Sequence, residues 1–309
     1  MRIILVGQGP FGEKTLDALI QRGEDIVGVF CPKGRAGEAM KGLAESSSIA
    51  LCQPDHMRDA AVLEAYRDLQ PDLVVLAFVT DILPGSLLDI PSIGTICYHP
   101  SLLPRHRGSS GINWAVIQGD TRTGLTILWA DKGIDTGAIL LQKEVDIEPH
   151  DTTGSLYFNK LFPMGIDAIV EAVDLIKSGK APRIEQDESL ATYEPPCDEK
   201  QAGIDWSKPA TVVYNMIRGC DPQPGAFSTI GGEKVKFFQA ELIDEQAQTS
   251  SGQIIDIGEG KMVVALDGGA LKIGKLKGEK SAKIGAVEFA DEAGLKVGMR
   301  FGEKEIELK

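Results

Sequence analysis

The first two-thirds of the chain alternate short runs of β-branched residues with amphipathic stretches, and this alternation constrains the fold more than any other feature. Helical patterns such as those at residues 10–21 and 60–69 separate the apolar runs. Strands that alternate with helices in this way are typical of an α/β domain with a mostly parallel sheet. The predicted strands cover residues 2–6, 25–30, 72–78, 94–99, 124–130 and 139–145.

The pattern changes in the last third of the chain. One long helix is expected from about Thr152 to Ser178, and residues 180–203 are expected to form an irregular linker. After a further helix at 209–218, short alternating runs are broken by glycines, which predicts a small antiparallel β-barrel. Its hairpins are expected at the turns GGEK, GEGK and DGGA, at residues 231–234, 258–261 and 267–270.

The length of the chain fits two domains. A chain of 309 residues exceeds the roughly 250–300 residues at which a single core usually stops growing. We place the boundary at the end of the predicted linker. The expected domains are residues 1–203, which would carry the catalytic site, and residues 204–309, which would form the barrel.

The charge of the chain is concentrated in the first of these domains. Residues 1–204 hold 18 Lys and Arg against 29 Asp and Glu, whereas residues 205–309 hold 14 against 16. Nucleic acids bind mainly through Lys and Arg that neutralise phosphates, so the acidic domain disfavours them as partners. A run of lysines in the small domain is the exception, and it is more typical of a solvated strand face. It comprises Lys272, Lys275, Lys277, Lys280 and Lys283.

Two further features concern location and covalent cross-links. No apolar run reaches the roughly 18 residues that span a bilayer, and the start MRIILVGQG is too short an apolar stretch for a signal peptide. We therefore expect a cytoplasmic protein with no membrane partner. The 5 cysteines are odd in number and contain no CxxC pair, so neither a disulfide framework nor a metal site is indicated.

A glycine motif follows the first predicted strand. Gly7, Gly9 and Gly12 form GxGxxG between a strand and a helix, the context of a dinucleotide fingerprint. The next strand, however, ends in VGVFCPKG, with no carboxylate to bind a ribose hydroxyl. We therefore do not expect NAD, and we interpret the glycines as a turn that lets the first helix pack close to the sheet.

The segment GTICYHPSLLPRHRGSSGINW has the composition of a site. His99 ends a predicted strand, and ligands of open α/β sheets bind outside the carboxyl ends of strands. Strand side chains alternate between faces, so Cys97 and His99 are expected on one face and Tyr98 on the other. A Pro-bracketed loop with two arginines follows, which favours a functional His99 over a structural one.

A second candidate lies about 30 residues later in WADKGIDTGAILLQ. Asp135 stands between Gly133 and Gly137, in a tight connection between two apolar strands. A carboxylate fixed at a strand end can orient or deprotonate a neighbouring imidazole. An Asp that bonds its own backbone in a turn is the alternative, and the residue pattern does not decide between the two.

Several separated motifs together resemble those of the folate-dependent formyltransferase and hydrolase family. The matching text is YHPSLLPRHRG, GIDTG, IDWSKPA and IRGCDPQPGAF, and the likeness covers nearly the whole chain. The family includes methionyl-tRNA and sugar-amine formyltransferases and the hydrolase domain of 10-formyltetrahydrofolate dehydrogenase. The resemblance implies a Rossmann-like domain that binds 10-formyltetrahydrofolate without NAD or a metal, followed by a small OB-like β-barrel.

The resemblance also implies catalytic residues. The transferases of the family use an Asn, a His and an Asp, and the last two match His99 and Asp135. Cys97 stands at the Asn position, where the family's amide donates to the formyl oxygen. A thiol is a weak donor, and loss of one such donor costs on the order of 100 to 1,000-fold in rate in acyl transfer. A covalent role for Cys97 as a formyl thioester is a minor alternative, because a Cys on a strand is usually inert.

By analogy with the family, the pterin pocket is expected along the strand end and two loops. Its predicted residues are Leu76, Phe78, Ser101, Leu102, Leu103, Asp131 and Ile134. Arg105 and Arg107 are candidates to meet the folate glutamate tail or an acceptor phosphate.

The function that the resemblance favours is hydrolysis of 10-formyltetrahydrofolate to tetrahydrofolate and formate, because the hydrolase domain likewise lacks the Asn donor. The alternative is formyl transfer to an amine, either methionyl-tRNA or an amino sugar nucleotide, with tRNA disfavoured by the acidic charge. A non-catalytic folate-binding module is an alternative of another class. The pattern does not indicate an oligomeric state.

Overall fold

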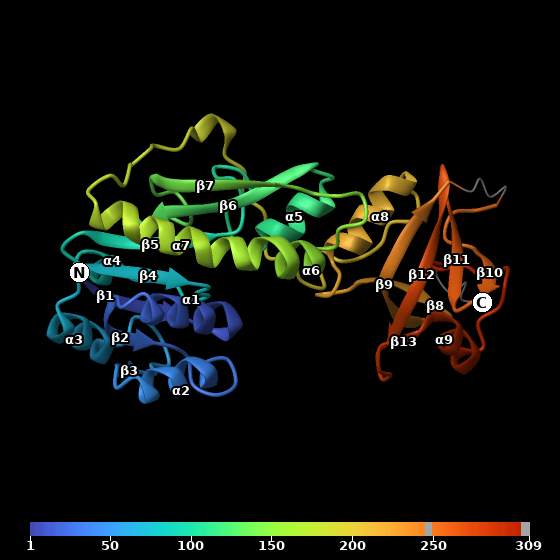
Figure 1. Cartoon of the computed structure of the whole chain (residues 1–309). Coiled ribbons are helices and arrows are strands. Elements are labelled where there is room, and N and C mark those ends of the chain that lie inside the picture. The colour runs from blue at the N-terminus through green and yellow to red at the C-terminus, as the bar shows by residue number, and fades with distance from the viewer. Residues whose placement is uncertain (245–248, 304–309) are drawn as a thin grey trace. The chain divides into compact units, whose positions relative to one another are not determined.

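The computed structural model of the protein describes residues 1–244 and 249–303 and divides into two compact units (Figure 1). The first unit comprises Met1–Gly111, Thr123–Val145 and Phe158–Glu194, and the second comprises Ile112–Arg122, Asp146–Tyr157 and the chain from Pro195 onward. The predicted linker is thus shared: residues 180–194 belong to the first unit and residues 195–203 to the second. The domain boundary expected at residues 203–204 lies within the second unit.

The first unit is built on a seven-stranded sheet whose first five strands are parallel. The spatial order is β3 (Ala50–Cys52), β2 (Asp25–Phe30), β1 (Arg2–Gly7), β4 (Leu73–Ala77), β5 (Gly94–His99), β6 (Arg122–Trp129) and β7 (Ile139–Asp146). Strand β6 runs antiparallel to β5. The predicted mostly parallel, Rossmann-like sheet is confirmed. The short strand β3 was not predicted, because three residues are too few to show a pattern.

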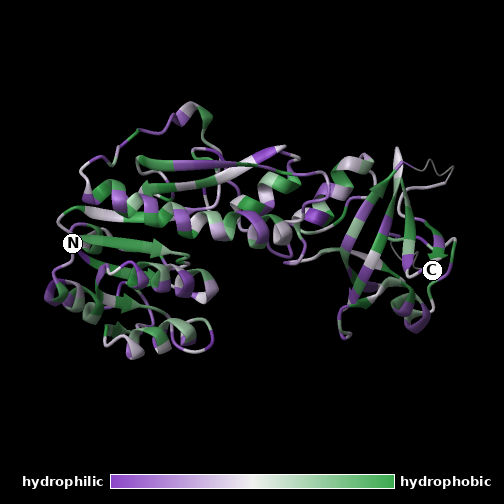
Figure 2. Cartoon of the chain, viewed as in Figure 1, coloured by the Kyte–Doolittle hydropathy of each residue, from purple (hydrophilic) through white to green (hydrophobic). Residues whose placement is uncertain are grey.

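The side chains of β1 show why this sheet needs helices on both faces. Ile3 and Leu5 belong to a core that includes residues of α1 (Gly9–Gln21), α2 (Glu38–Ser46) and α7 (Phe162–Lys177). Ile4 and Val6 point the other way, into a core with α3 (Ala60–Leu69) and α4 (Gly85–Leu88). A strand buried on both faces reads as a continuous apolar run, and β4 is coloured hydrophobic along its length in Figure 2.

The long helix predicted from Thr152 to Ser178 is confirmed, with one irregular turn inside it. It begins at α6 (Thr153–Leu156) with a capping box of Thr152 and Ser155, and a π-helical segment, Tyr157–Leu161, separates α6 from α7. Pro163 lies in the first turn of α7. Proline lacks an N–H and its ring clashes with the preceding turn, which fits the widened π-helical turn just before Pro163.

The structure confirms the interpretation of the first glycine motif as a close-packing turn. A Cβ on Gly12 would lie 2.7 Å from Sδ of Met40 and 3.1 Å from the backbone of Gly7. Both separations are shorter than ordinary van der Waals contacts. Glycine at these positions therefore lets α1 lie close to β1 and α2.

The second unit contains an antiparallel sheet, as predicted. The order is β10 (Ile254–Gly258), β11 (Lys261–Leu266), β12 (Gly269–Gly278), β9 (Glu233–Ile243) and β8 (Ala226–Ile230), and β13 (Ile284–Gly285) pairs with β12. The three predicted hairpin turns are confirmed, because they connect β8 to β9, β10 to β11 and β11 to β12.

Helices α8 (Ala210–Gly219) and α9 (Ala286–Ala293) contribute to the core of the second unit. The same core contains Trp206, Phe237 and Phe301, whose rings contact one another. Two further helices are α5 (Gly111–Ile117) and the short 3-10 helix Glu188–Leu190. Within residues 1–244 and 249–303, no helix is both long and apolar enough to cross a bilayer.

Candidate active site

The site lies where β4 and β5 end at the same edge of the sheet. Leu76 of β4 is in register with Cys97 of β5, and His99 is the last residue of β5. The His99 side chain is buried. Tyr98 points into the opposite core, against Phe11, so the alternation predicted for Cys97, Tyr98 and His99 matches the packing.

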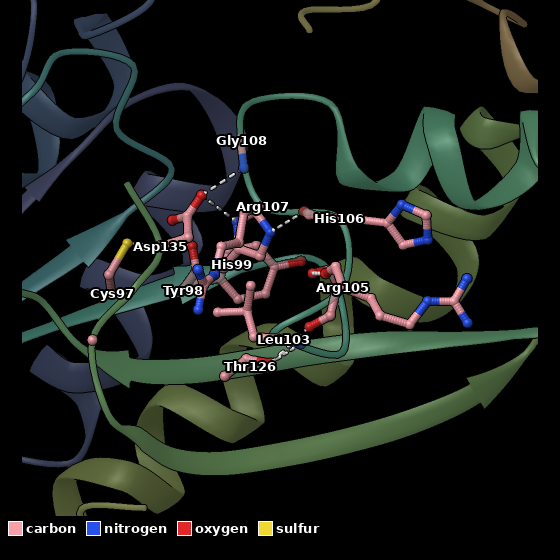
Figure 3. A network of polar contacts seen from close by, with 12 residues as sticks. Cys97, Tyr98, His99, Leu103, Arg105, His106, Arg107, Gly108, Thr126 and Asp135 are labelled. Carbon is pink, nitrogen blue, oxygen red and sulfur yellow. Dashed lines mark hydrogen bonds and ion pairs between the residues drawn. The ribbon is translucent and has the colours of Figure 1, made fainter. Parts of the chain in front are cut away.

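The loop after β5 is held in place by hydrogen bonds to its backbone. Thr126 of β6 donates its hydroxyl to Ser101 O at 2.7 Å and accepts from Leu103 N at 3.2 Å. Gln142 of β7 donates to Leu103 O at 2.9 Å, and the Ser101 hydroxyl donates to Arg105 O at 2.7 Å. Thr126 and Gln142 come from the antiparallel edge of the sheet, so β6 and β7 help to fix the loop that carries the next site residues (Figure 3).

Asp135 and His99 are brought together by the fold. Asp135 lies in the connection between β6 and β7, and its Oδ2 is 3.5 Å from Nδ1 of His99. The same oxygen accepts from the backbone N–H of Gly108 at 2.8 Å. The two side chains are 6% and 17% exposed, so this pair is largely shielded from bulk water.

The other nitrogen of His99 defines the state of the ring. Nε2 lies 2.8 Å from the backbone carbonyl oxygen of His106. A carbonyl oxygen only accepts hydrogen bonds, so Nε2 carries a proton. Nδ1, which faces Asp135, is therefore the nitrogen that can take up or release a proton.

Cys97 is a neutral thiol in this setting. Burial raises the pKa of Cys97 to about 12, and the negative charge of Asp135 adds to the effect. Its Sγ donates a weak hydrogen bond to Tyr98 O at 3.6 Å. The nucleophilic form of a cysteine is the thiolate, so at neutral pH this side chain is a poor nucleophile and a weak donor.

The predicted pocket residues fall into two groups. Leu76, Ser101 and Leu103 are buried, and Leu102 is half-buried. Phe78, Asp131 and Ile134 are exposed, and Phe78 and Ile134 are large apolar side chains that are 43% and 55% exposed. The exposed group lies at the ends of β4 and β6, on the loops beside His99 and Asp135.

Arg107 corrects one expectation from the sequence. It was a candidate for the folate tail or an acceptor phosphate, but its side chain is fully buried. Its guanidinium donates to both carboxylate oxygens of Glu188, at 2.9 and 2.6 Å, and to Gln186 and Tyr193. A guanidinium that is committed to these partners is not available to a ligand, whereas Arg105 is exposed.

The partners of this loop come from a segment that the sequence pattern presented as a linker. Besides the contacts to Arg107, Glu194 Oε1 lies 3.2 Å from Nδ1 of His106, and the Thr192 hydroxyl accepts from His106 N at 2.8 Å. Residues 186–194 therefore form a second layer behind the site. The backbone of this segment is mostly irregular, so its sequence has no periodic pattern. Its charged and aromatic residues are the one feature of the sequence that points to these contacts.

A cavity of about 270 Å³ lies at the carboxyl ends of β1, β2 and β4. Its lining includes Gln8, Phe30, Met57 and Asp81, together with the predicted pocket residue Phe78. No three His, Cys, Asp or Glu side chains gather as metal ligands would in the part of the chain that the structure describes.

Comparison with known proteins gives the family context. A sequence model of the family described as formyl transferase matches residues 1–173, and one described as formyl transferase, C-terminal domain, matches residues 197–294. The chain is 39% identical over 306 residues to mitochondrial 10-formyltetrahydrofolate dehydrogenase of Mus musculus, covering 94% of this chain and 33% of that protein. It therefore spans about a third of the length of that relative.

Other relatives are matched along their whole length. The methionyl-tRNA formyltransferase of Geotalea uraniireducens is 38% identical over 305 residues, which is 96% of both chains. Among solved structures, HypX from Aquifex aeolicus in complex with tetrahydrofolic acid has a TM-score of 0.71 at 20% identity, covering 99% of this chain and 51% of its own. A Helicobacter canadensis N-formyltransferase solved with folinic acid and dTDP-3-aminofucose has a TM-score of 0.68 at 18% identity, covering 88% of this chain and 98% of its own.

Proposed function

Because the chain belongs to the formyl transferase family, we propose that it acts on the formyl group of 10-formyltetrahydrofolate and transfers that group to water. The observation that carries the proposal is the pair of His99 and Asp135 beside a neutral Cys97. The pair supplies acid and base groups. The thiol leaves the formyl oxygen without the strong neutral donor that favours rapid transfer to amines.

The chemistry begins with a water molecule that Asp135 orients. Its Oδ2 is held by the Gly108 N–H and faces His99, so Oδ1 is the oxygen that would receive the water proton. The water oxygen forms a bond to the formyl carbon, and the carbonyl electron pair moves to the formyl oxygen. Protonated Nδ1 of His99 supports that oxyanion, since Nε2 remains bonded to His106 O.

Collapse of the tetrahedral intermediate breaks the bond between the formyl carbon and N10 of the folate. N10 takes the proton that Asp135 received from the water, the second water proton is released to solvent, and the products are tetrahydrofolate and formate. One water is consumed and no redox partner is needed. The exposed side chains of Phe78 and Ile134 would cover the pterin during this step.

Transfer to an amine is the second candidate. It is favoured by the match along 96% of a methionyl-tRNA formyltransferase, which includes the antiparallel domain. The same Asp135 would then deprotonate the attacking amine. In that case the lysine run on and after β12, where Lys277 and Lys280 are exposed, would contact the tRNA phosphates.

The deciding experiment uses the full chain with 10-formyltetrahydrofolate alone and with methionyl-tRNA or a dTDP-amino sugar added. Release of formate without an acceptor, lost in Asp135→Asn, is the expected result. A formylated acceptor, with formate only at the background rate, would identify a transferase. Binding of the folate with neither product would identify a non-catalytic module.

A further inference from the structure

Gln186 lies between Arg107 and the connection that carries Asp135. Its Nε2 donates to Asp135 O at 2.8 Å and to Gly137 O at 2.7 Å. Its Oε1 accepts from Nη2 of Arg107 at 2.8 Å. The partners define the orientation of the amide, because carbonyls only accept and a guanidinium only donates. One partly buried amide therefore uses both of its ends within the site.

The Asp135 backbone needs outside support. Its φ is +56°, in the left-handed region that L residues occupy when their surroundings impose it. Two residues later, a Cβ on Gly137 would lie 1.7 Å from Trp129 O, so the turn is pressed against β6. The two hydrogen bonds from Gln186 hold the carbonyls of Asp135 and Gly137 in the arrangement that this tight turn requires.

The other end of the amide reaches the segment that binds the Asp135 carboxylate. Arg107 is fully buried, and the next residue, Gly108, donates its N–H to Oδ2 of Asp135. Gln186 therefore contacts the backbone of Asp135 and the side chain of Arg107. Arg107 directly precedes Gly108, whose N–H binds the Asp135 carboxylate. A shift of Gln186 would move these two supports together.

We propose that Gln186 is a positioning residue for Asp135. It sets the direction of the carboxylate toward Nδ1 of His99 and the attacking water, and it acts through Asp135 rather than on the substrate. This inference rests on the proposed function for its effect on rate. Displacement of a catalytic group by about 1 Å can lower a rate on the order of 100-fold.

Two variants separate positioning from packing. Gln186→Glu keeps the length and an oxygen for Arg107, but it presents no N–H to the carbonyls of Asp135 and Gly137. Gln186→Met removes both sets of contacts. Gln53→Met is the matched control, because Gln53 is also a partly buried amide of the first unit and donates to a carbonyl, Pro32 O, at 3.0 Å.

For formate release, both Gln186 variants are expected to lower kcat at least tenfold. Their dissociation constant for 5-formyltetrahydrofolate, a non-reactive probe, should stay within threefold of wild type. Gln53→Met should keep kcat within twofold. All rates are measured well below the melting temperature of each variant. A Gln186→Glu protein with wild-type kcat would overturn the proposal, as would a loss of folate affinity equal to the loss of kcat.

A second measurement needs no turnover. Hydrogen exchange of the Gly108 amide reports directly on its bond to Asp135, and we expect it to accelerate at least tenfold in both Gln186 variants but not in Gln53→Met. If the wild type releases no formate, the proposed function fails. The exchange of Gly108 then still decides the positioning role, and unchanged exchange in Gln186→Glu and Gln186→Met overturns it.

Discussion

The imidazole Nε2 of His99 is bonded to the backbone carbonyl oxygen of His106, 2.8 Å away, and this contact turns Nδ1 toward Asp135. The loop after β5 thus folds back on the histidine that precedes it. The contact fixes the tautomer and the direction of the reactive nitrogen before any ligand arrives. The energetic cost of orienting these groups is therefore met during folding rather than during the reaction.

The first prediction concerns the two acid–base residues. His99→Ala and Asp135→Ala remove a proton-transfer group but little of the expected pocket wall. We expect turnover of 10-formyltetrahydrofolate to fall by at least about 100-fold. Affinity for 5-formyltetrahydrofolate, measured by titration calorimetry, should change by less than tenfold. A variant that keeps wild-type turnover would remove that residue from the mechanism.

The second prediction concerns Cys97. Cys97→Ala and Cys97→Ile should release formate at close to the wild-type rate, because a thiol with a pKa of about 12 supplies neither a nucleophile nor a strong donor. Formate release and melting temperature are measured for both. Loss of activity in the alanine variant, with a formylated Cys97 trapped in the wild type, would instead show a covalent intermediate.

Cys97→Asn tests the opposite change. An amide at this position restores a donor worth roughly 2.7 to 4 kcal/mol in the transition state, so we expect faster transfer to an added amine, by at least tenfold. Asn is larger than Cys and polar, so the substitution at this part-buried position should lower the melting temperature. Mass spectrometry of the acceptor gives the result, and an unchanged rate in a folded variant would show that Cys97 does not occupy a donor position.

The third prediction concerns thiol reactivity. Cys197 and Cys220 have their sulfur atoms 3.9 Å apart, and the hydrogen bond from Cys220 lowers the pKa of Cys197. A thiol with a lowered pKa is deprotonated at lower pH, so Cys197 should react with iodoacetamide first as the pH rises from about 7. At pH 8 about one Cys97 in 10,000 is ionised for a pKa of about 12. Peptide mapping that finds Cys97 alkylated before Cys197 would contradict this order.

The fourth prediction concerns the buried guanidinium. Arg107→Met removes the donors to Gln186, Glu188 and Tyr193 and leaves the partly buried amide oxygen of Gln186 without them, so we expect a loss of about 1–3 kcal/mol in the free energy of unfolding. Glu188→Gln should cost less, because that carboxylate is 67% exposed to solvent. Urea unfolding of both variants gives the comparison.

The pH dependence of this pair has a definite sign. The guanidinium of Arg107 holds the pKa of Glu188 below its ordinary value of 4.5. The ion pair therefore contributes its full stability above about pH 4.5, and the contribution is lost as the pH falls through the lowered pKa. The stability difference between wild type and Glu188→Gln should accordingly shrink in acid. A difference that grows below pH 4 would contradict the assignment.

The fifth prediction concerns tRNA. The acidic first two-thirds of the chain offers few phosphate contacts, so tRNA should bind weakly, and the logarithm of its affinity should fall only gently with the logarithm of salt concentration. Filter binding at several salt concentrations measures the slope. A slope as steep as that of proteins with 6 to 10 phosphate contacts would show that the lysine run on β12 outweighs the net charge, and would favour the transferase.

The local residue pattern is enough to predict both kinds of sheet. Residues 73–77 form an apolar run that fits a strand buried on both faces, whereas the strands after Ala226 alternate and are separated by glycine turns. Both signals depend on neighbouring residues along the chain. The two site residues at strand ends can also be identified from the sequence, because His99 ends an apolar run and Asp135 stands between two glycines.

The partners that these residues contact depend on how the whole chain folds. Arg107 looked like a ligand-binding arginine, yet it is paired with Glu188, 81 positions later, and Gln186 reaches the Asp135 backbone from 51 positions away. The π-helical turn after Leu156, inside a helix that the sequence pattern predicted as regular, likewise depends on backbone geometry before Pro163. Contacts between distant segments leave no periodic trace in the sequence, because they depend on where the sheet places each loop.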